Sequence, residues 1–106
     1  MNELTVFENK DFGQIRTVVR QGEPWFVAAD VCKALDVDPT ATRRLDDDEK
    51  DTLRLTQGTS GNPNVTIVNE PGLYALVLGS RKPEAKAFKR WITHEVIPSI
   101  RKTGSY

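Results

Sequence analysis

The alternation of hydrophobic and polar residues divides the chain into short segments, each with a period typical of a strand or of a helix. Residues 4–7 and 15–20 are rich in β-branched side chains, and a turn at 11–13 separates them. A second turn at 22–24 leads into the apolar segment 25–27. This pattern predicts a three-stranded antiparallel meander.

A change to helical periodicity follows the meander. Apolar residues recur at i, i+3, i+4 and i+7, as Ala28, Val31, Cys32 and Leu35. They predict a short helix that buries Cys32. Asp38 followed by Pro39 is a helix-start signal and predicts a second short helix over 39–45. Two short helices joined by about three residues have the proportions of a helix-turn-helix.

The second half of the chain predicts a hairpin followed by another helix. Residues 52–56 alternate with period two, and 65–68 are β-branched, so we expect two strands joined by a loop at 57–64. Asn69 is a suitable cap for a helix that Gly79 would end.

A longer basic helix is expected to begin at Pro83. Its apolar side comprises Ala85, Phe88, Trp91, Ile92 and Val96. Its polar side comprises Lys86, Lys89, Arg90 and Thr93. Pro98 interrupts the continuation, so the helix must kink there or stop and restart. The expected fold is therefore α+β, with a small antiparallel sheet, a helix-turn-helix-like pair and a longer basic C-terminal helix.

Length and charge refine this expectation. A chain of 106 residues suits a single domain. The formal net charge is +0, but it is segregated: 36–51 holds seven acids and three bases, whereas 81–106 holds seven bases and two acids. Such a chain can present a basic face to nucleic acid while its acidic face is repelled.

The single cysteine and the short apolar runs indicate where the protein resides. Cys32 cannot form an intrachain disulfide, and residues 1–10 lack the pattern of a signal peptide. The apolar stretch 73–78 is too short to cross a bilayer. We therefore expect a reducing compartment, the cytoplasm of a host cell, and no membrane partner.

Four blocks of residues, spread over nearly the whole chain, resemble one known family in their order. They are Trp-Phe-Val with Ala-Asp-Val-Cys-Lys-Ala-Leu (25–35), Asn-Glu-Pro-Gly-Leu-Tyr (69–74), Phe-Lys-Arg-Trp (88–91) and Glu-Val-Ile-Pro-Ser-Ile-Arg (95–101). The family is the N-terminal domain of the BRO family, Bro-N. The resemblance implies an α+β module, residues 1–106 here, at the N-terminus of phage antirepressors and related viral regulators. It also implies that some members bind DNA, and it supplies no catalytic residues.

Two groups of residues are candidates for DNA contact. In a helix-turn-helix the second helix enters the major groove, where arginine and threonine can meet base edges. The candidates for base readout are therefore Thr40, Thr42, Arg43 and Arg44. The acids after Leu45 leave open the alternative that Arg43 and Arg44 only pair with them. The candidates for phosphate contact form a basic stripe, Lys82, Lys86, Lys89 and Arg90.

Other chemistry receives little support from the sequence. His94 is the only histidine, so no metal-ligand pattern forms, and residues 46–51 lack the spacing of a calcium loop. We expect no enzyme activity, metal or cofactor. The expected function is that of a DNA-binding module of a phage or prophage transcription regulator, with double-stranded DNA as partner and a homodimer as one assembly. The alternative is a protein-interaction module that neutralises a phage repressor without contacting DNA.

Overall fold

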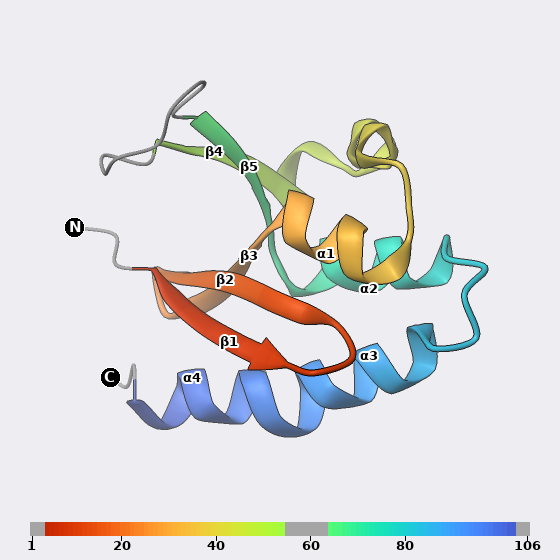
Figure 1. The fold of residues 1–106 in the computed structure, drawn as a ribbon. Helices are drawn as coiled ribbons and strands as arrows, with labels where there is room; N and C mark the ends of the chain where they lie inside the picture. Colours follow the sequence, from red (N-terminus) through yellow and green to blue (C-terminus); the bar gives the residue numbers. More distant parts are fainter. Residues whose placement is uncertain (1–3, 55–63, 104–106) are drawn as a thin grey trace.

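Five strands form one antiparallel sheet in the order β1-β2-β3-β5-β4 (Figure 1). The computed structural model describes residues 4–54 and 64–103. The strands are β1 (Thr5–Asn9), β2 (Gly13–Arg20), β3 (Glu23–Val27), β4 (Lys50–Arg54) and β5 (Asn64–Val68). The expected α+β class, the meander and the hairpin are confirmed. The predicted strand residues 55 and 56 and the loop residues 57–63 lie outside the described ranges.

The meander and the hairpin are joined through β3 and β5. Phe26 pairs with Val68, and Val27 pairs with Ile67, across about 40 intervening residues. The turn between β2 and β3 lies one residue earlier than predicted. It consists of Gln21 and Gly22, whose φ angles of 53° and 77° suit the two-residue hairpin turns that match the strand twist.

Helices cover the sheet and enclose the main core. They are α1 (Ala28–Leu35), α2 (Glu70–Leu78), α3 (Ala85–Trp91) and α4 (Ile97–Thr103). One cluster of buried side chains joins all four helices to the sheet, with Phe26, Leu35, Leu73 and Phe88 among its largest members. The predicted burial of Cys32 is confirmed. Asn69 caps α2 as expected, because its side chain accepts a hydrogen bond from the Gly72 N–H at 3.0 Å.

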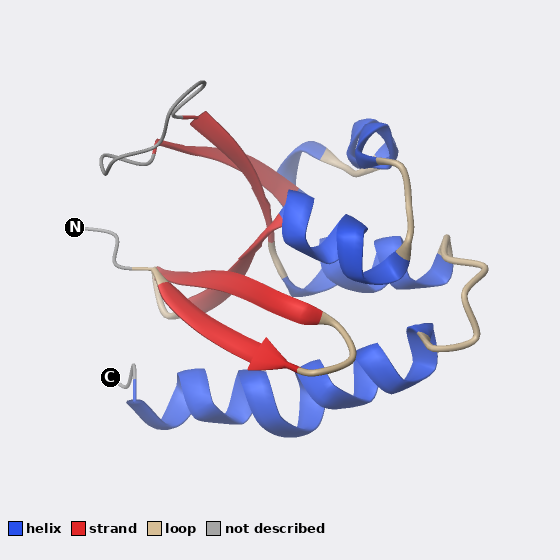
Figure 2. Ribbon diagram, viewed as in Figure 1, coloured by secondary structure: helices blue, strands red, loops and turns tan. Residues whose placement is uncertain are grey.

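The last helix begins at Ala85, two residues later than predicted, and it passes Pro98 without stopping (Figure 2). The π-helical turn η3 (Ile92–Val96) lies between α3 and α4. Proline has no N–H and clashes with the carbonyl four residues before it, so the wider turn accommodates Pro98. Side chains of this turn also contact carbonyls of the preceding helix. Thr93 Oγ1 donates to the Lys89 carbonyl at 3.0 Å, and His94 Nδ1 lies 3.1 Å from the Arg90 carbonyl.

The second element of the predicted helix-turn-helix differs from expectation. Residues Pro39–Arg44 form a 3-10 helix, η1, and Leu45 already has extended backbone. Such helices occur as short pieces, and bonds between residues three apart are present here, with the Ala41 N–H donating to the Asp38 carbonyl at 2.9 Å and the Leu45 N–H donating to the Thr42 carbonyl at 3.1 Å. The pair α1 and η1 is thus compact, but its second member is not an α-helix.

A second short helix, η2 (Asp47–Glu49), follows within the acidic run and is fastened to α2. Asn69 donates through its backbone N–H to the Glu49 carbonyl at 3.1 Å and through its side chain to the Asp48 carbonyl at 2.9 Å. A side chain at Gly72 would place its Cβ 2.6 Å from the Glu49 carbonyl oxygen. Only glycine therefore permits this close approach.

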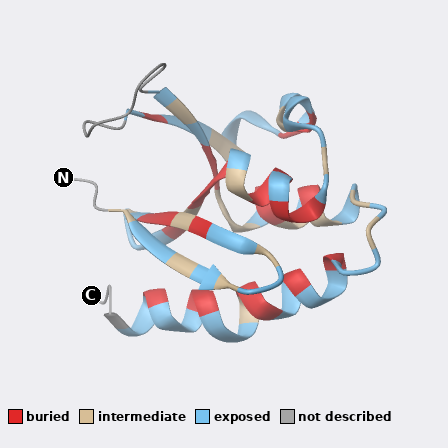
Figure 3. Cartoon of the chain, viewed as in Figure 1, coloured by how far each residue is buried: buried red, intermediate tan, exposed pale blue. Residues whose placement is uncertain are grey.

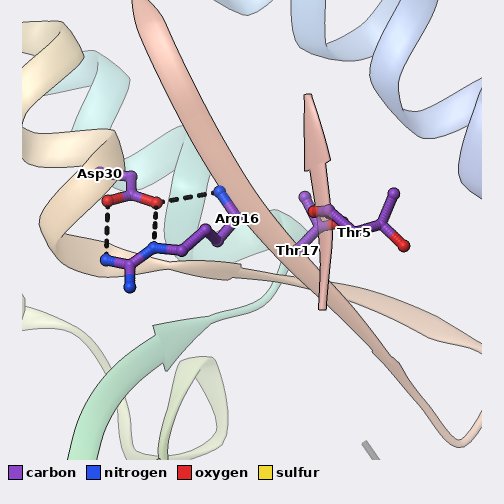
Figure 4. A network of polar contacts seen from close by, with 4 residues as sticks. All are labelled: Thr5, Arg16, Thr17 and Asp30. Carbon is purple, nitrogen blue, oxygen red and sulfur yellow. Dashed lines mark hydrogen bonds and ion pairs between the residues drawn. The ribbon is translucent and has the colours of Figure 1, made fainter. Parts of the chain in front are cut away.

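A half-buried ion pair between Arg16 of β2 and Asp30 in the first turn of α1 connects the sheet to this helix (Figure 4). Asp30 accepts from the Arg16 backbone N–H and from Nε, both at 2.9 Å, and from Nη2 at 3.0 Å. The hydrogen bonds to Asp30 raise the pKa of Arg16 above the ordinary value of an arginine side chain. Beside this pair, Thr17 is buried and donates to the Thr5 carbonyl at 3.0 Å.

A smaller apolar cluster lies apart from the main core and consists of Val18, Val27, Leu53 and Ile67. Trp25 is half-buried at the edge of this cluster, and the Arg20 guanidinium lies 5.5 Å from its ring centroid. Within residues 4–54 and 64–103, no helix has the length and apolar character needed to cross a bilayer.

Candidate nucleic-acid interface

Three of the four residues in the predicted basic stripe lie on α3. Lys86, Lys89 and Arg90 are exposed, and we call this set the α3 basic face. The opposite side of the same helix is buried against the β1–β2 hairpin, as expected for Phe88 and Trp91 (Figure 3). In the described part of the chain, neither Lys86 nor Arg90 forms an ion pair. Their charges are therefore available to a ligand.

Lys82 does not belong to this face. It precedes α3 and is half-buried, and its ammonium donates to the Ala34 carbonyl at 3.4 Å, in the last turn of α1. A cation at this position interacts favourably with the negative end of the helix dipole. The structure thus gives Lys82 a contact within the domain.

Lys89 has a neighbour on α2. Its ammonium lies 5.7 Å from the ring centroid of Tyr74, whose hydroxyl donates to Glu70 at 2.9 Å. Arg101 approaches the same carboxylate at 3.5 Å. Burial, together with the hydrogen bond to Glu70, raises the pKa of Tyr74 to about 12. The cation of Lys89 is held above an aromatic ring but remains exposed.

The raised pKa of Tyr74 predicts a loss of stability in alkali. The folded chain keeps the phenol proton above the ordinary pKa of 10.0, so this contribution is complete below pH 10 and disappears as the pH rises through about 12. Between these values, the free energy of unfolding should fall more steeply for the wild type than for Tyr74→Phe. Denaturant melts at stepped pH values measure both slopes. Equal slopes, or a phenolate absorbance difference between the two proteins with its midpoint near pH 10, would contradict the assignment.

The four candidates for base readout do not share one face. The Asp38 carboxylate accepts from both the backbone and the hydroxyl of Thr40, each at 2.9 Å, and these bonds lower the pKa of Asp38. Arg43 and Arg44, although adjacent, line two different hollows on either side of η1. The structure therefore brings Thr42 and Arg43 together and separates them from Arg44.

The hollow beside Arg43 is polar. It has a volume of about 350 Å³ and lies between η1, η2 and the β4–β5 hairpin. We call it the polar hollow, and its lining residues are Thr42, Arg43, Asp47, Lys50, Asp51, Thr52 and Thr66. Sequence reasoning missed Lys50, Thr52 and Thr66. Period two could have placed Lys50 and Thr52 on one face of their strand, but their approach to η1 depends on the tertiary fold.

The hollow beside Arg44 is largely apolar. It has a volume of about 210 Å³, and we call it the apolar hollow. Its lining residues come from η1, α2 and the segments next to them, namely Val37, Ala41, Arg44, Leu45, Ala75, Leu76 and Gly79. Leu78, which precedes Gly79 in the chain, is 87% exposed.

The acidic run forms a turn of its own. Asp46 and Glu49 make a capping box, in which the Glu49 carboxylate accepts from the Asp46 N–H at 2.9 Å. Among residues 4–54 and 64–103, no ion pair joins these acids to Arg43 or Arg44. The alternative that both arginines are neutralised by the acids is therefore not what the structure shows. In the same ranges, no three potential ligand residues converge on a metal site.

The fold and the surface charge define a small α+β module with a one-sided basic helix, and comparisons with known proteins identify its family. The model of the BRO family N-terminal domain, Bro-N, matches residues 14–98. The chain belongs to this family.

Relatives occur in a bacterium and in viruses. A Haemophilus influenzae protein is 40% identical over 108 residues, which is 98% of this chain and 53% of that protein. Bro-N domain-containing protein 289L of invertebrate iridescent virus 6 is 30% identical over 113 residues, 88% of this chain and 27% of that protein. The chain thus spans about half of the length of these relatives, or less. No solved structure matches it.

Proposed function

We propose that this Bro-N domain is the DNA-binding module of an antirepressor-type transcription regulator of phage or prophage origin. The α3 basic face carries the proposal, because it presents three exposed cations on one side of a helix. Phosphate contacts supply most of the non-specific affinity of proteins for DNA and set their orientation on the duplex. In this role Lys86, Lys89 and Arg90 contact the backbone.

Sequence preference then depends on η1. Thr42 and Arg43 both line the polar hollow, which Thr40 does not, although the hydroxyls of both threonines donate within η1, that of Thr42 to the Pro39 carbonyl at 3.0 Å and that of Thr40 to Asp38 at 2.9 Å. Arginine can bond to guanine with two hydrogen bonds, and such a pair discriminates against the wrong base by about 1–3 kcal/mol. We therefore assign base readout to Arg43, supported by Thr42, and omit Thr40 and Arg44.

Selection of ligands from random duplex DNA at moderate salt tests the proposal. The wild type should enrich a defined sequence. Arg43→Ala should then lose about 1–3 kcal/mol on the enriched site and little on random DNA, with nearly the same salt dependence. Arg44→Ala, one residue away on the other side of η1, is the matched control and should retain the preference. If the wild type binds no duplex at low salt, DNA recognition by this module is wrong.

A second function is favoured by the apolar hollow and by the exposed Leu78 next to it. An exposed leucine beside an apolar depression is typical of a protein contact. The alternative is therefore a module that captures a phage repressor and relieves repression without touching DNA. Replacement of Leu78 by serine would weaken repressor capture but leave DNA affinity unchanged, so the two functions can be separated.

A further inference from the structure

We infer that the polar hollow is a second phosphate site, in which Lys50, Thr52 and Thr66 hold one phosphate of the nucleic-acid backbone next to Arg43. This inference rests on the proposed function and extends it from α3 to the sheet. It assigns to the β4–β5 hairpin a direct part in DNA contact.

The hollow is rich in unused hydrogen-bond donors. Thr52 and Thr66 face each other across β4 and β5, and within the described ranges neither hydroxyl has a hydrogen-bond partner. Lys50 uses one of its three N–H groups on the Thr42 carbonyl at 3.2 Å, which orients its ammonium beside η1. Arg43 is exposed and makes no ion pair in the described part of the chain. Four donor side chains therefore surround one space.

The carboxylates of the hollow are not equivalent. Asp51 accepts from Arg20 Nη1 at 2.8 Å and from the Thr52 N–H at 2.8 Å, and these bonds keep the pKa of Asp51 below its usual value. Its charge is thus matched by a cation outside the lining. Within the lining, only Asp47 then opposes Arg43 and Lys50, and Arg43 also interacts with the charge of Asp38 outside the lining, so the hollow offers an excess of hydrogen-bond donors beside two cations. Groups that accept several hydrogen bonds and carry negative charge fit this chemistry, as the oxygens of a phosphodiester do.

The position of the hollow suits a backbone contact beside base readout. Phosphate contacts fix the register of a protein on DNA, and base contacts specify the sequence. A phosphate held by the hairpin would lie next to Arg43, which borders the same space. The guanidinium could then reach a base edge while the backbone is fixed beside it.

Binding measurements on variants separate this inference from the proposed function. Thr52→Val with Thr66→Val keeps the shape and the strand preference of both residues but removes both hydroxyls. It should weaken all duplexes about tenfold without changing the salt slope, because no charge is lost. Lys50→Met should weaken binding and flatten the slope by about 0.9. Thr5→Val, on the strand at the opposite edge of the sheet, should bind like the wild type.

Removing the negative charge of Asp47 provides an independent test, because the direction of the change in duplex affinity depends on the charge that the hollow prefers. Asp47→Asn should strengthen duplex binding, roughly threefold, because it removes the carboxylate that repels phosphate. A weaker complex would mean that the hollow prefers a cation and would overturn the inference.

Amide shifts in NMR spectra identify the source of the phosphate. A short duplex should shift the amides of Thr52 and Thr66 together with those of α3. Shifts confined to α3, with unchanged affinity of the double valine variant, would overturn the inference and leave the proposed function intact. Saturable shifts at the hairpin with inorganic phosphate at constant ionic strength, but none with duplex, would make the hollow a small-anion site and would also overturn it. If no duplex binds, the inference and the proposed function fail together.

Discussion

Phe88→Ala should lower the free energy of unfolding by about 3–5 kcal/mol, a large share of the stability of a domain of this size. Phe88 is 0% exposed on α3 and lies at the centre of an aromatic group. Its ring meets the edge of Phe12 at a centroid distance of 5.3 Å and that of Trp91 at 6.1 Å. Truncation would leave a cavity between the last helix and the β1–β2 turn, and denaturant melts would measure the cost.

Lys86→Ala, on the exposed side of the same helix, is the matched control for stability. Alanine is a strong helix former, so this change should stay within about 0.5 kcal/mol of the wild type. A loss below about 1 kcal/mol for Phe88→Ala would show that the helix does not depend on this side chain for packing.

Replacing Lys86, Lys89 and Arg90 together by alanine should weaken binding to every duplex on the order of 100-fold at about 0.1 M salt. Each cation that neutralises a phosphate releases condensed counterions, so the salt slope should flatten by about 0.9 per lost contact. The enriched sequence should stay the same, since these residues lie on α3 and not on η1. Fluorescence anisotropy over a series of salt concentrations would measure affinity and slope together.

The control for this variant is a cation outside both proposed surfaces. Lys33 is exposed on α1, so Lys33→Ala removes one charge and should leave the salt slope nearly unchanged, whereas Arg90→Ala should reduce it. If both single variants lower the affinity equally, binding reflects net charge and not a defined α3 basic face. A triple variant with wild-type affinity would exclude α3 from the interface.

Most elements of the fold could be predicted from local patterns, because each depends on neighbours along the chain. The stripe of Ala28, Val31, Cys32 and Leu35 defines α1, and the cap at Asn69 defines the start of α2. The pairing of β3 with β5 could not be predicted in this way. It joins residues about 40 positions apart, and no local periodicity specifies such a partner.

The candidate site was harder to predict than the fold. The exposure of Lys86, Lys89 and Arg90 follows from helical periodicity alone. Lys82 was misplaced because Pro83 resembles a helix start, whereas the helix begins at Ala85. The polar hollow forms only where η1 and the β4–β5 hairpin lie side by side, and this arrangement depends on the tertiary fold and not on local sequence. The division of Arg43 from Arg44 likewise depends on what packs on each side of a 3-10 helix.

The π-helical turn η3 also sets the rotational phase of the last helix. At about 100° per residue, an uninterrupted α-helix would place Ile97 roughly 180° from Phe88 around the helix axis, facing away from the core. The one additional residue in η3 turns the following segment back by about 100°. Ile97 and Ile100 are consequently buried, although the helical periodicity of the sequence leaves both off the apolar side. A single inserted residue thus keeps two successive helical segments on the same core.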